Sequence, residues 1–232
     1  MTMIADNLHA VRSRIAQACT AAGRSADAVQ LLAVSKTFGP EAVQAAFDAG
    51  QRAFGENYIQ EAVEKMAALE HLAVEWHCIG PIQSNKTRLV AEHFQWVHTV
   101  DRLKIAQRLS EQRPAHLPPL QVCIQVNVDG GPTKSGVVPD EALALAQAVG
   151  ALPRLQLRGL MCIPEPAPDF VAASAVFARA RGLFNALNTA GLALDTLSMG
   201  MSADLDAAVA SGSTLVRVGT AIFGGRSYPA AT

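Results

Sequence analysis

Lys36 is the residue of this sequence best placed to act as a nucleophile. It is one of five lysines, and it directly follows the apolar run at residues 31–35 and its last serine. Desolvation at the end of a buried strand lowers the pKa of a lysine and favours the neutral amine, which attacks carbonyl carbons to form Schiff bases. A lysine in this position can also be a surface residue whose stem covers apolar atoms while its ammonium group stays in water. Lys36 alone does not distinguish the two roles.

A second group of residues, near the end of the sequence, has the character of a phosphate site. Ser198 and Ser202 lie in the segment LSMGMS, and Gly219 and Thr220 follow another apolar run. Serine hydroxyls and the backbone N–H groups of glycine-containing turns commonly bind phosphate oxygens. Ser202 is alternatively the N-cap of a helix expected over 204–210, a role that is compatible with phosphate binding.

A carbonyl-reactive lysine together with a phosphate site is the combination that pyridoxal 5′-phosphate (PLP) requires, since its pyridine ring carries both an aldehyde and a phosphate. Arg217, close to the end of the last apolar run, is expected beside the ring nitrogen. An arginine there keeps this nitrogen unprotonated and so weakens the electron sink that most PLP reactions need. The alternative role for Arg217 is a structural salt bridge below the site.

Two further polar residues are expected to contact the cofactor. His77 is suited to hydrogen bonding with the ring substituents or with a nearby side chain, although a histidine on a strand is more commonly a core residue. Asn57 stands where a helix is expected to begin, so capping of this helix is the alternative role for its side chain. The histidines form no HExxH or similar ligand pair, and the sequence therefore predicts no metal site.

Apolar strand-like runs alternate with helical stretches along the whole sequence, a pattern typical of parallel sheets with crossover helices. We expect strands at residues 31–35, 52–54, 74–79, 96–100, 120–128, 155–161, 194–198 and 214–218. We expect helices at 41–49, 58–69, from 85, 101–111, from 139 or 140, 169–190 and 204–210, and an additional helix before the first strand. Eight such units without a linker predict an α/β fold, a single (β/α)8 barrel domain over 1–232. Functional residues of such barrels sit where the strands end.

Length, composition and charge exclude several classes of protein. A chain of 232 residues with 50% hydrophobic and 17% charged residues can bury a sizeable core, which excludes disorder. The formal net charge of −1 provides no basic field for a nucleic acid or an anionic membrane. The four cysteines form no CxxC pair, which favours reduced thiols in the core. Without a membrane-spanning apolar stretch or a secretory signal, the protein is expected to be cytoplasmic.

The motifs that contain these residues resemble one family. They are AVSKT at 33–37, FGENYIQE at 54–61, WHCIGPIQSNK at 76–86, RGLMCIP at 158–164, SMGMS at 198–202 and VRVGTAIFG at 216–224. In order and spacing they are similar to the pyridoxal phosphate homeostasis proteins, a group related to the N-terminal barrel of bacterial alanine racemases. The resemblance implies a barrel that holds PLP as a Schiff base on Lys36, with the phosphate near the segments of strands seven and eight and Arg217 by the ring nitrogen. It also implies that Lys134 is a secondary cofactor contact.

The same resemblance implies that the protein buffers and delivers PLP in vitamin B6 homeostasis rather than turning over a substrate. One alternative is a PLP-dependent amino-acid racemase, but alanine racemases take a tyrosine for the opposite face of the cofactor from a second domain, and only Tyr58 and Tyr228 are present here. Another alternative is a class I aldolase, which would use Lys36 on a carbonyl substrate without a cofactor. This hypothesis explains the phosphate-binding segments less specifically. We therefore expect a monomeric carrier without significant turnover, whose partners are PLP and PLP-dependent apoenzymes.

Overall fold

Eight parallel strands form a closed barrel in the computed structural model, which describes residues 3–131 and 135–225. Along the chain the strands are β1 (Gln30–Val34), β2 (Ala53–Glu56), β3 (Glu75–Cys78), β4 (Trp96–Val100), β5 (Leu120–Gln125), β6 (Leu155–Met161), β7 (Thr196–Ser198) and β8 (Leu215–Val218). Consecutive strands are neighbours, and the pairing of Ala33 with Val218 joins β1 to β8. The predicted (β/α)8 barrel is confirmed.

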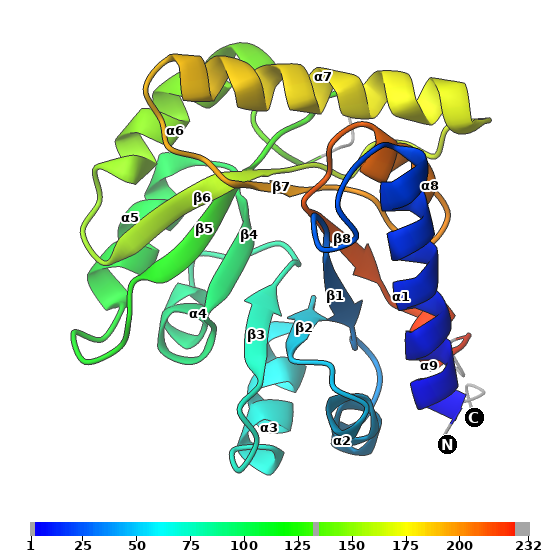
Figure 1. Cartoon of the computed structure of the whole chain (residues 1–232). Coiled ribbons are helices and arrows are strands. Elements are labelled where there is room, and N and C mark those ends of the chain that lie inside the picture. Colours follow the sequence, from blue (N-terminus) through cyan, green and yellow to red (C-terminus); the bar gives the residue numbers. More distant parts are fainter. Residues whose placement is uncertain (1–2, 132–134, 226–232) are drawn as a thin grey trace, which may run out of the picture.

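Helices surround the strands (Figure 1). They are α1 (Met3–Ala21), α2 (Pro40–Asp48), α3 (Ile59–Ala68), α4 (Thr87–His93), α5 (Leu103–Gln112), the 3₁₀ turn η1 (Pro139–Glu141), α6 (Ala142–Gly150), α7 (Phe170–Thr189), α8 (Leu205–Ala210) and α9 (Thr220–Phe223). α2 shows how sequence sets the limits of a helix. Pro40 suits its first turn because it needs no N–H partner there, and Gly50 follows its end with a φ of +89° that disfavours other residues.

The additional helix α1 connects segments that are far apart in the sequence. It packs against α2 and against the late helices α8 and α9, beside which it runs in Figure 1. Leu8, Val11 and Ile15 recur at helical spacing and form its buried face. The side-chain amide of Asn7 donates a hydrogen bond of 2.9 Å to the carbonyl oxygen of Ile222 in α9.

Polar side chains occupy part of the barrel interior, where branched apolar residues usually pack. His77, His98, Ser198 and Arg217 are all buried. A hydrogen bond joins His98 of β4 to Ser198 of β7, two strands that are not neighbours, so these side chains meet across the inside of the barrel. The main apolar core lies instead in the layer between the strands and the helices.

Most element boundaries agree with the expectations from the sequence. The expected strands 96–100 and 155–161 coincide with β4 and β6. The expected strand 120–128 was too long, because β5 ends at Gln125 and the Asn127 side chain, which accepts from the N–H of Gly130, stabilises a turn instead. The short helix α9 was not predicted. Its four residues are too few to show a helical period.

Neither alternative capping role is realised. The N-cap of α8 is Asp204 rather than Ser202, and the N-cap of α3 is Tyr58 rather than Asn57. The side chains of Ser202 and Asn57 are therefore not used as helix caps.

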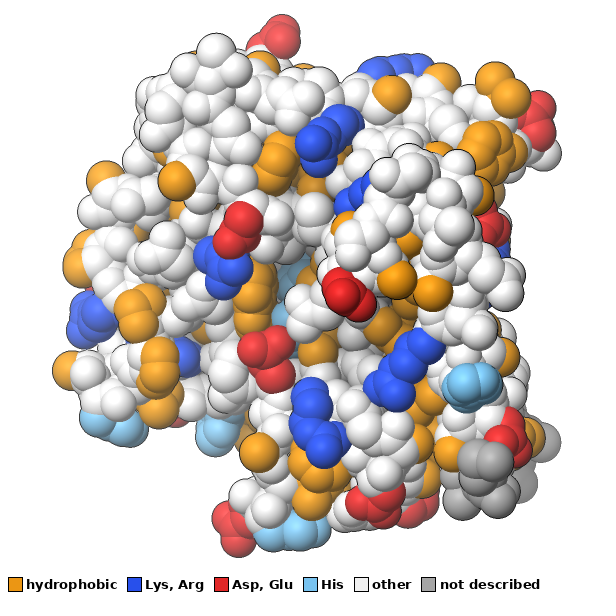
Figure 2. All heavy atoms as spheres, viewed as in Figure 1, with side chains coloured by type: hydrophobic (Ala, Val, Ile, Leu, Met, Phe, Trp, Pro, Cys, Tyr) orange, Lys and Arg blue, Asp and Glu red, His pale blue; other side chains and the backbone are white. Residues whose placement is uncertain are grey.

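The cysteines and the surface also agree with the composition. Cys19, Cys78, Cys123 and Cys162 are free and buried, and burial raises the pKa of the last three to about 12. On the face drawn in Figure 2, acidic and basic side chains are interspersed. Within the described part of the chain, no helix is both long enough and apolar enough to cross a membrane.

Candidate functional site

A cavity of about 310 Å³ opens at the carboxyl ends of the strands. Its walls are formed by Val34, Lys36, Asn57, Ile79, Ile163, Met201, Ser202, Ala203, Arg217, Gly219 and Thr220. The cavity brings together six of the eight cofactor-binding residues expected from the sequence. They are Lys36, Asn57, Ser202, Arg217, Gly219 and Thr220.

Lys36 lies in a tight bend directly after β1. The N–H of Phe38 donates to the carbonyl oxygen of Ser35 (3.1 Å), and Thr37 adopts a left-handed φ of +69°. This conformation is unfavourable for a branched residue. The Thr37 N–H donates to Oε1 of Glu61 on α3 (2.9 Å), which holds the bend in place. Both neighbours of Lys36 are therefore fixed by hydrogen bonds, so that its position at the cavity wall is well defined.

A buried ion pair supports this bend from below. Nζ of Lys65 lies 2.7 Å from Oε1 of Glu56 and 3.0 Å from the carbonyl oxygen of Ser35, whose hydroxyl donates to the same carboxylate oxygen. Burial raises the pKa of Glu56, and the nearby Lys65 partly offsets this effect. The sequence does not indicate this pair, because Glu56 and Lys65 lie on different elements. The spacing of Glu61 and Lys65, four residues apart on α3, indicates only the contact between those two side chains, whose charged atoms lie 3.4 Å apart.

Asn57 provides an unused polar group in the cavity wall. Its Oδ1 is buried and has no hydrogen-bond partner among the described residues. Gly80, in the loop after β3, packs so closely that a Cβ there would lie 2.2 Å from the carbonyl oxygen of Asn57. The absence of a side chain at Gly80 therefore allows Asn57 to occupy this position. A buried polar atom without a partner is costly, and a bound polar ligand would remove this cost.

The loops after β7 and β8 form the wall that carries Ser202, Gly219 and Thr220. A Cβ at Gly219 would lie 3.0 Å from the carbonyl oxygen of Val34, so glycine permits the close approach of this loop to β1. α9 begins at Thr220, and the first N–H groups of a helix lack intrahelical partners. This wall thus combines a hydroxyl with backbone donors, which suits an anion such as phosphate.

Arg14, which no motif in the sequence indicates, fixes the Ser202 loop from outside the cavity. Its guanidinium donates to the carbonyl oxygen of Ser202 (2.7 Å) and forms an ion pair with Asp206 on α8. Together with the bond from Asn7 to α9, this contact ties α1 to both segments of the candidate phosphate wall. The additional helix therefore supports the site although it does not line it.

Arg217 enters the cavity from the barrel interior. Its guanidinium donates to the carbonyl oxygens of Ser198 and Cys162 (both 2.9 Å) and to Oγ of Ser198 (2.8 Å). Burial lowers the pKa of Arg217, and the oxygen acceptors help to keep its charge inside the protein. No salt bridge to Arg217 occurs among residues 3–131 and 135–225, so the alternative structural role expected for it is not seen.

The other two expected residues, Ser198 and His77, lie inside the barrel and do not line the cavity. His77 hydrogen-bonds a nearby side chain, with Nδ1 2.8 Å from Nε2 of His98. Burial lowers the pKa of His77 and lowers that of His98 well below 6.5, so both rings are neutral near pH 7. The sequence signal for His98 was its position two residues after Trp96, on the same side of β4.

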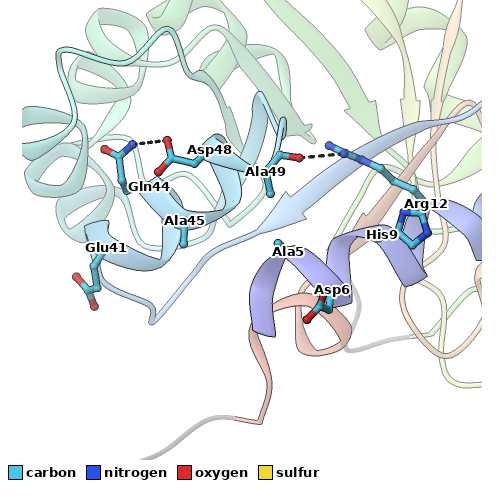
Figure 3. Close-up of a pocket in the computed structure, with 9 residues that line it drawn as sticks. All are labelled: Ala5, Asp6, His9, Arg12, Glu41, Gln44, Ala45, Asp48 and Ala49. Atoms are coloured by element: carbon cyan, nitrogen blue, oxygen red, sulfur yellow. Dashed lines mark hydrogen bonds between the residues drawn. The ribbon is translucent and has the colours of Figure 1, made fainter. Parts of the chain in front are cut away.

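A larger groove of about 850 Å³ lies on the outside of the barrel, between α1 and α2. Figure 3 shows that it is lined by Asp6, His9 and Arg12 of α1 and by residues of α2, and that Arg12 donates to the carbonyl oxygen of Ala49. It contains no lysine and none of the expected site residues. Lys134, expected as a secondary contact, lies outside the described residues.

Comparison with known proteins matches residues 7–227 to the family described as "Alanine racemase, N-terminal domain". The pyridoxal phosphate homeostasis protein of Pseudomonas aeruginosa is 61% identical over 230 residues, which cover 99% of each chain. A solved structure of PipY from Synechococcus elongatus with PLP bound is 39% identical, with a TM-score of 0.84 over 95% of this chain and 100% of that one. Alanine racemase from Corynebacterium glutamicum, 19% identical with a TM-score of 0.68, shares the fold over 99% of this chain and 63% of its own.

The resemblance expected from the motifs is thus confirmed over almost the whole chain. The match to the family extends from α1 to beyond α9, and so includes every segment that lines the cavity. The chain belongs to the alanine racemase N-terminal domain family and, within it, to the pyridoxal phosphate homeostasis proteins.

Proposed function

We propose that this protein binds PLP in the cavity at the strand ends, holds it reversibly on Lys36, and thereby stores and delivers the cofactor. The observation that carries this proposal is the convergence of Lys36, Arg217 and the Ser202 loop on one cavity of about 310 Å³. A primary amine, a fixed cation and a set of anion-binding donors match the aldehyde, ring nitrogen and phosphate of PLP. The similarity to the pyridoxal phosphate homeostasis protein of Pseudomonas aeruginosa and to the PLP-bound PipY structure supports the same cofactor.

Each side chain has a distinct task in this proposal. Lys36 condenses with the aldehyde carbon, and one water molecule leaves. Ser202 and the N–H groups at the start of α9 receive the phosphate, whose charge they offset. Arg217 faces the ring nitrogen and, being cationic, disfavours its protonation. When bound, PLP supplies an electron-withdrawing ring, and an unprotonated nitrogen makes that ring a weak electron sink. Asn57 supplies its unused Oδ1 to a polar group of the bound molecule.

A carrier fits the cavity better than a racemase. Racemization needs an acid or base on each face of the substrate, and the described lining of this cavity includes only Lys36 as a candidate proton carrier. Tyr58 is exposed and lies outside the lining, and Tyr228 is not among the described residues. The structural likeness to alanine racemases extends to the fold alone. We accordingly propose a monomeric protein without significant turnover that gives its PLP to apoenzymes.

Reductive labelling tests the attachment site. Purified protein is incubated with PLP, reduced with borohydride, digested and analysed by mass spectrometry. We expect the added mass on Lys36, in preference to the other four lysines of the chain. The control is Lys104→Arg, a change on the exposed side of α5 that should leave the labelling intact. Wild-type protein that carries its label elsewhere would exclude the proposed site.

Two further assays separate a carrier from an enzyme. In the first, PLP-loaded protein is mixed with a PLP-dependent apoenzyme, and recovery of that enzyme's activity measures delivery. In the second, exchange of the α-proton of several amino acids in deuterated water is followed at high protein concentration. We expect delivery without exchange. Robust exchange that is lost in Lys36→Arg would identify a catalyst instead.

A further inference from the structure

Five polar side chains form a continuous hydrogen-bonded chain through the barrel, which we call the interior relay. Nη1 of Arg217 lies 2.8 Å from Oγ of Ser198, and this oxygen lies 2.9 Å from Nδ1 of His98. Nε2 of His98 lies 2.8 Å from Nδ1 of His77, whose Nε2 lies 2.8 Å from Oε1 of Glu75. Glu75 is the first residue of β3, so the relay runs from the cavity to the opposite end of the barrel.

The chemistry of the two ends fixes the direction of every bond in the relay. A guanidinium is only a donor, and an ionised carboxylate is only an acceptor. The hydrogen bond from His77 lowers the pKa of Glu75, which keeps it ionised near neutral pH. Each neutral imidazole has one N–H and one acceptor nitrogen. All the bonds are satisfied only if both His77 and His98 carry their proton on Nε2 and the Ser198 hydroxyl donates to His98.

The relay is rigid as well as directed. The ring of Trp96 stacks on that of His77, with centroids 5.2 Å apart and planes 6° from parallel. The guanidinium carbon of Arg158 lies over the Trp96 ring, 4.8 Å from its centroid. Both histidines are fully buried, so bulk water does not offer their nitrogens alternative partners. Burying these polar groups costs free energy that an apolar layer would not, which points to a role other than stability.

We propose that Glu75 is a positioning residue, which acts through His77, His98 and Ser198 to hold the Arg217 guanidinium in one orientation in the cavity. This inference rests on the proposed function, in which Arg217 faces the ring nitrogen of PLP. With the relay in the direction that its two ends require, the proton of the Ser198 hydroxyl points to His98 and its lone pairs face Arg217. In the reversed direction His98 would donate to Ser198, and the buried hydroxyl proton of Ser198 would then have no acceptor within the relay. The hydroxyl would have to rotate toward an acceptor outside the relay, and this rotation would turn its lone pair away from the Arg217 guanidinium and weaken that contact.

The first test is the tautomeric state of the two histidines in the protein without PLP, measured by ¹⁵N NMR of the imidazole nitrogens. We expect protonation at Nε2 of both His77 and His98 in the wild type. Glu75→Lys replaces the terminal acceptor by a donor and should move the proton to Nδ1 in both rings, including His98, which residue 75 does not touch. Glu92→Lys, the same charge change on α4, is the matched control and should change neither ring. Unchanged tautomers in Glu75→Lys would overturn the proposal.

The second test connects the relay to the cofactor site. Loss of PLP from the loaded protein to an excess of a competing amine is followed by absorbance in the wild type, Glu75→Lys, Arg217→Lys and the double variant. One lost hydrogen bond corresponds to about a fivefold faster loss in Glu75→Lys. If Glu75 acts through Arg217, Glu75→Lys has no additional effect in the Arg217→Lys background. Rate effects that multiply would show that Glu75 acts independently of Arg217, and would overturn the proposal.

A third variant separates positioning from general damage. Ser198→Ala cuts the relay between His98 and Arg217 but leaves Glu75 in contact with His77. We expect wild-type tautomers in this variant, together with accelerated loss of PLP. Failure of the proposed function can be distinguished from failure of the relay proposal. If the proposed function is wrong, wild-type protein carries no PLP on Lys36, whatever the tautomers of the two histidines are.

Discussion

Nζ of Lys65 lies 2.7 Å from Oε1 of Glu56, and the side chains of the two residues are only 3% and 0% exposed. The pair lies under the bend that carries Lys36 and also binds the backbone of that bend through Ser35. An isolated pair at this depth adds little stability, but loss of one partner leaves the other charge buried without compensation. The contact is thus a condition for the position of Lys36.

Lys65→Met should destabilise the protein strongly, because it leaves the Glu56 carboxylate unpaired in the core. We expect the free energy of unfolding to fall by about 3–5 kcal/mol, measured by urea denaturation. The control is Arg88→Ala, which breaks an exposed pair with Glu92 on α4 and should cost less than about 1 kcal/mol. Equal losses in the two variants would contradict the role given to Lys65.

Gly80→Ala should displace Asn57 from the cavity wall. The new Cβ would lie 2.2 Å from the carbonyl oxygen of Asn57 and 2.7 Å from its Cα, so the loop must move. We expect a loss of about 1–3 kcal/mol in unfolding free energy and weaker PLP binding. Gly182→Ala, inside α7 with open space around the position, is the control and should stabilise by about 0.5–1 kcal/mol.

Arg14→Ala should weaken binding of the phosphate without a direct contact to it. Loss of the bond from Arg14 to the carbonyl oxygen of Ser202 loosens that loop. We expect roughly fivefold weaker binding of PLP, the equivalent of about 1 kcal/mol. Binding of pyridoxal, which has the aldehyde but no phosphate, should be unchanged. Both affinities are measured by fluorescence titration.

Arg24→Ala provides the matched control for this experiment. Arg24 donates to the carbonyl oxygen of Val209 (2.7 Å), near the other end of α8 from Ser202. The Arg24→Ala substitution therefore removes a comparable contact with α8 at a position away from the cavity. An equal loss of PLP and pyridoxal affinity in Arg14→Ala would show general damage rather than a phosphate-specific effect.

The buried histidines should make the protein less stable in mild acid. The pKa values of His77 and His98 are lowered by folding from 6.5, so below this pH the unfolded chain binds more protons than the folded one. The stability from the neutral rings is complete above about pH 6.5 and is lost as the pH falls toward the folded values. Each ring contributes at most about 1.4 kcal/mol per pH unit.

His98→Gln isolates this effect from the other titrating groups. The variant should be less stable than the wild type at pH 8, but the difference should shrink as the pH falls below 6.5, because the variant has one histidine fewer to protonate. Unfolding free energies at several pH values measure the difference. His93→Gln, on the exposed end of α4, should keep the wild-type dependence on pH. A constant difference between His98→Gln and the wild type would contradict the assigned burial effect.

The sequence predicts the fold and one wall of the site well, for physical reasons. β4 is buried throughout because both its faces are covered, and β6 alternates Leu155 and Leu157 with polar residues before its buried second half. Both patterns make these strands recognisable to the residue. Lys36 and the Ser202 and Gly219 segments follow strands, and Arg217 lies near the end of β8, so the barrel rule places all of them at one end. Their meeting in one cavity depends only on topology.

The parts that escaped prediction depend on contacts across the fold. His98 has ordinary neighbours in sequence, and its role follows from Ser198 lying opposite to it inside the barrel. Likewise, Arg14 lies on a helix well before the first strand, and nothing nearby in the sequence indicates a contact with residue 202. Such long-range pairings are decided by three-dimensional packing and not by local pattern.

The contacts of α1 have a consequence for how the chain folds. Asn7 and Ile222 are separated by 215 positions, and Arg14 and Asp206 by 192. During synthesis α1 is complete long before α8 and α9, so the part of its surface that packs on these two helices has no native partner for most of translation. Contacts this distant are slow to form because a long loop must close first. We therefore expect completion of the barrel to be a late, cooperative event after release of the final helices, and α1 to be the segment exposed to chaperones until then.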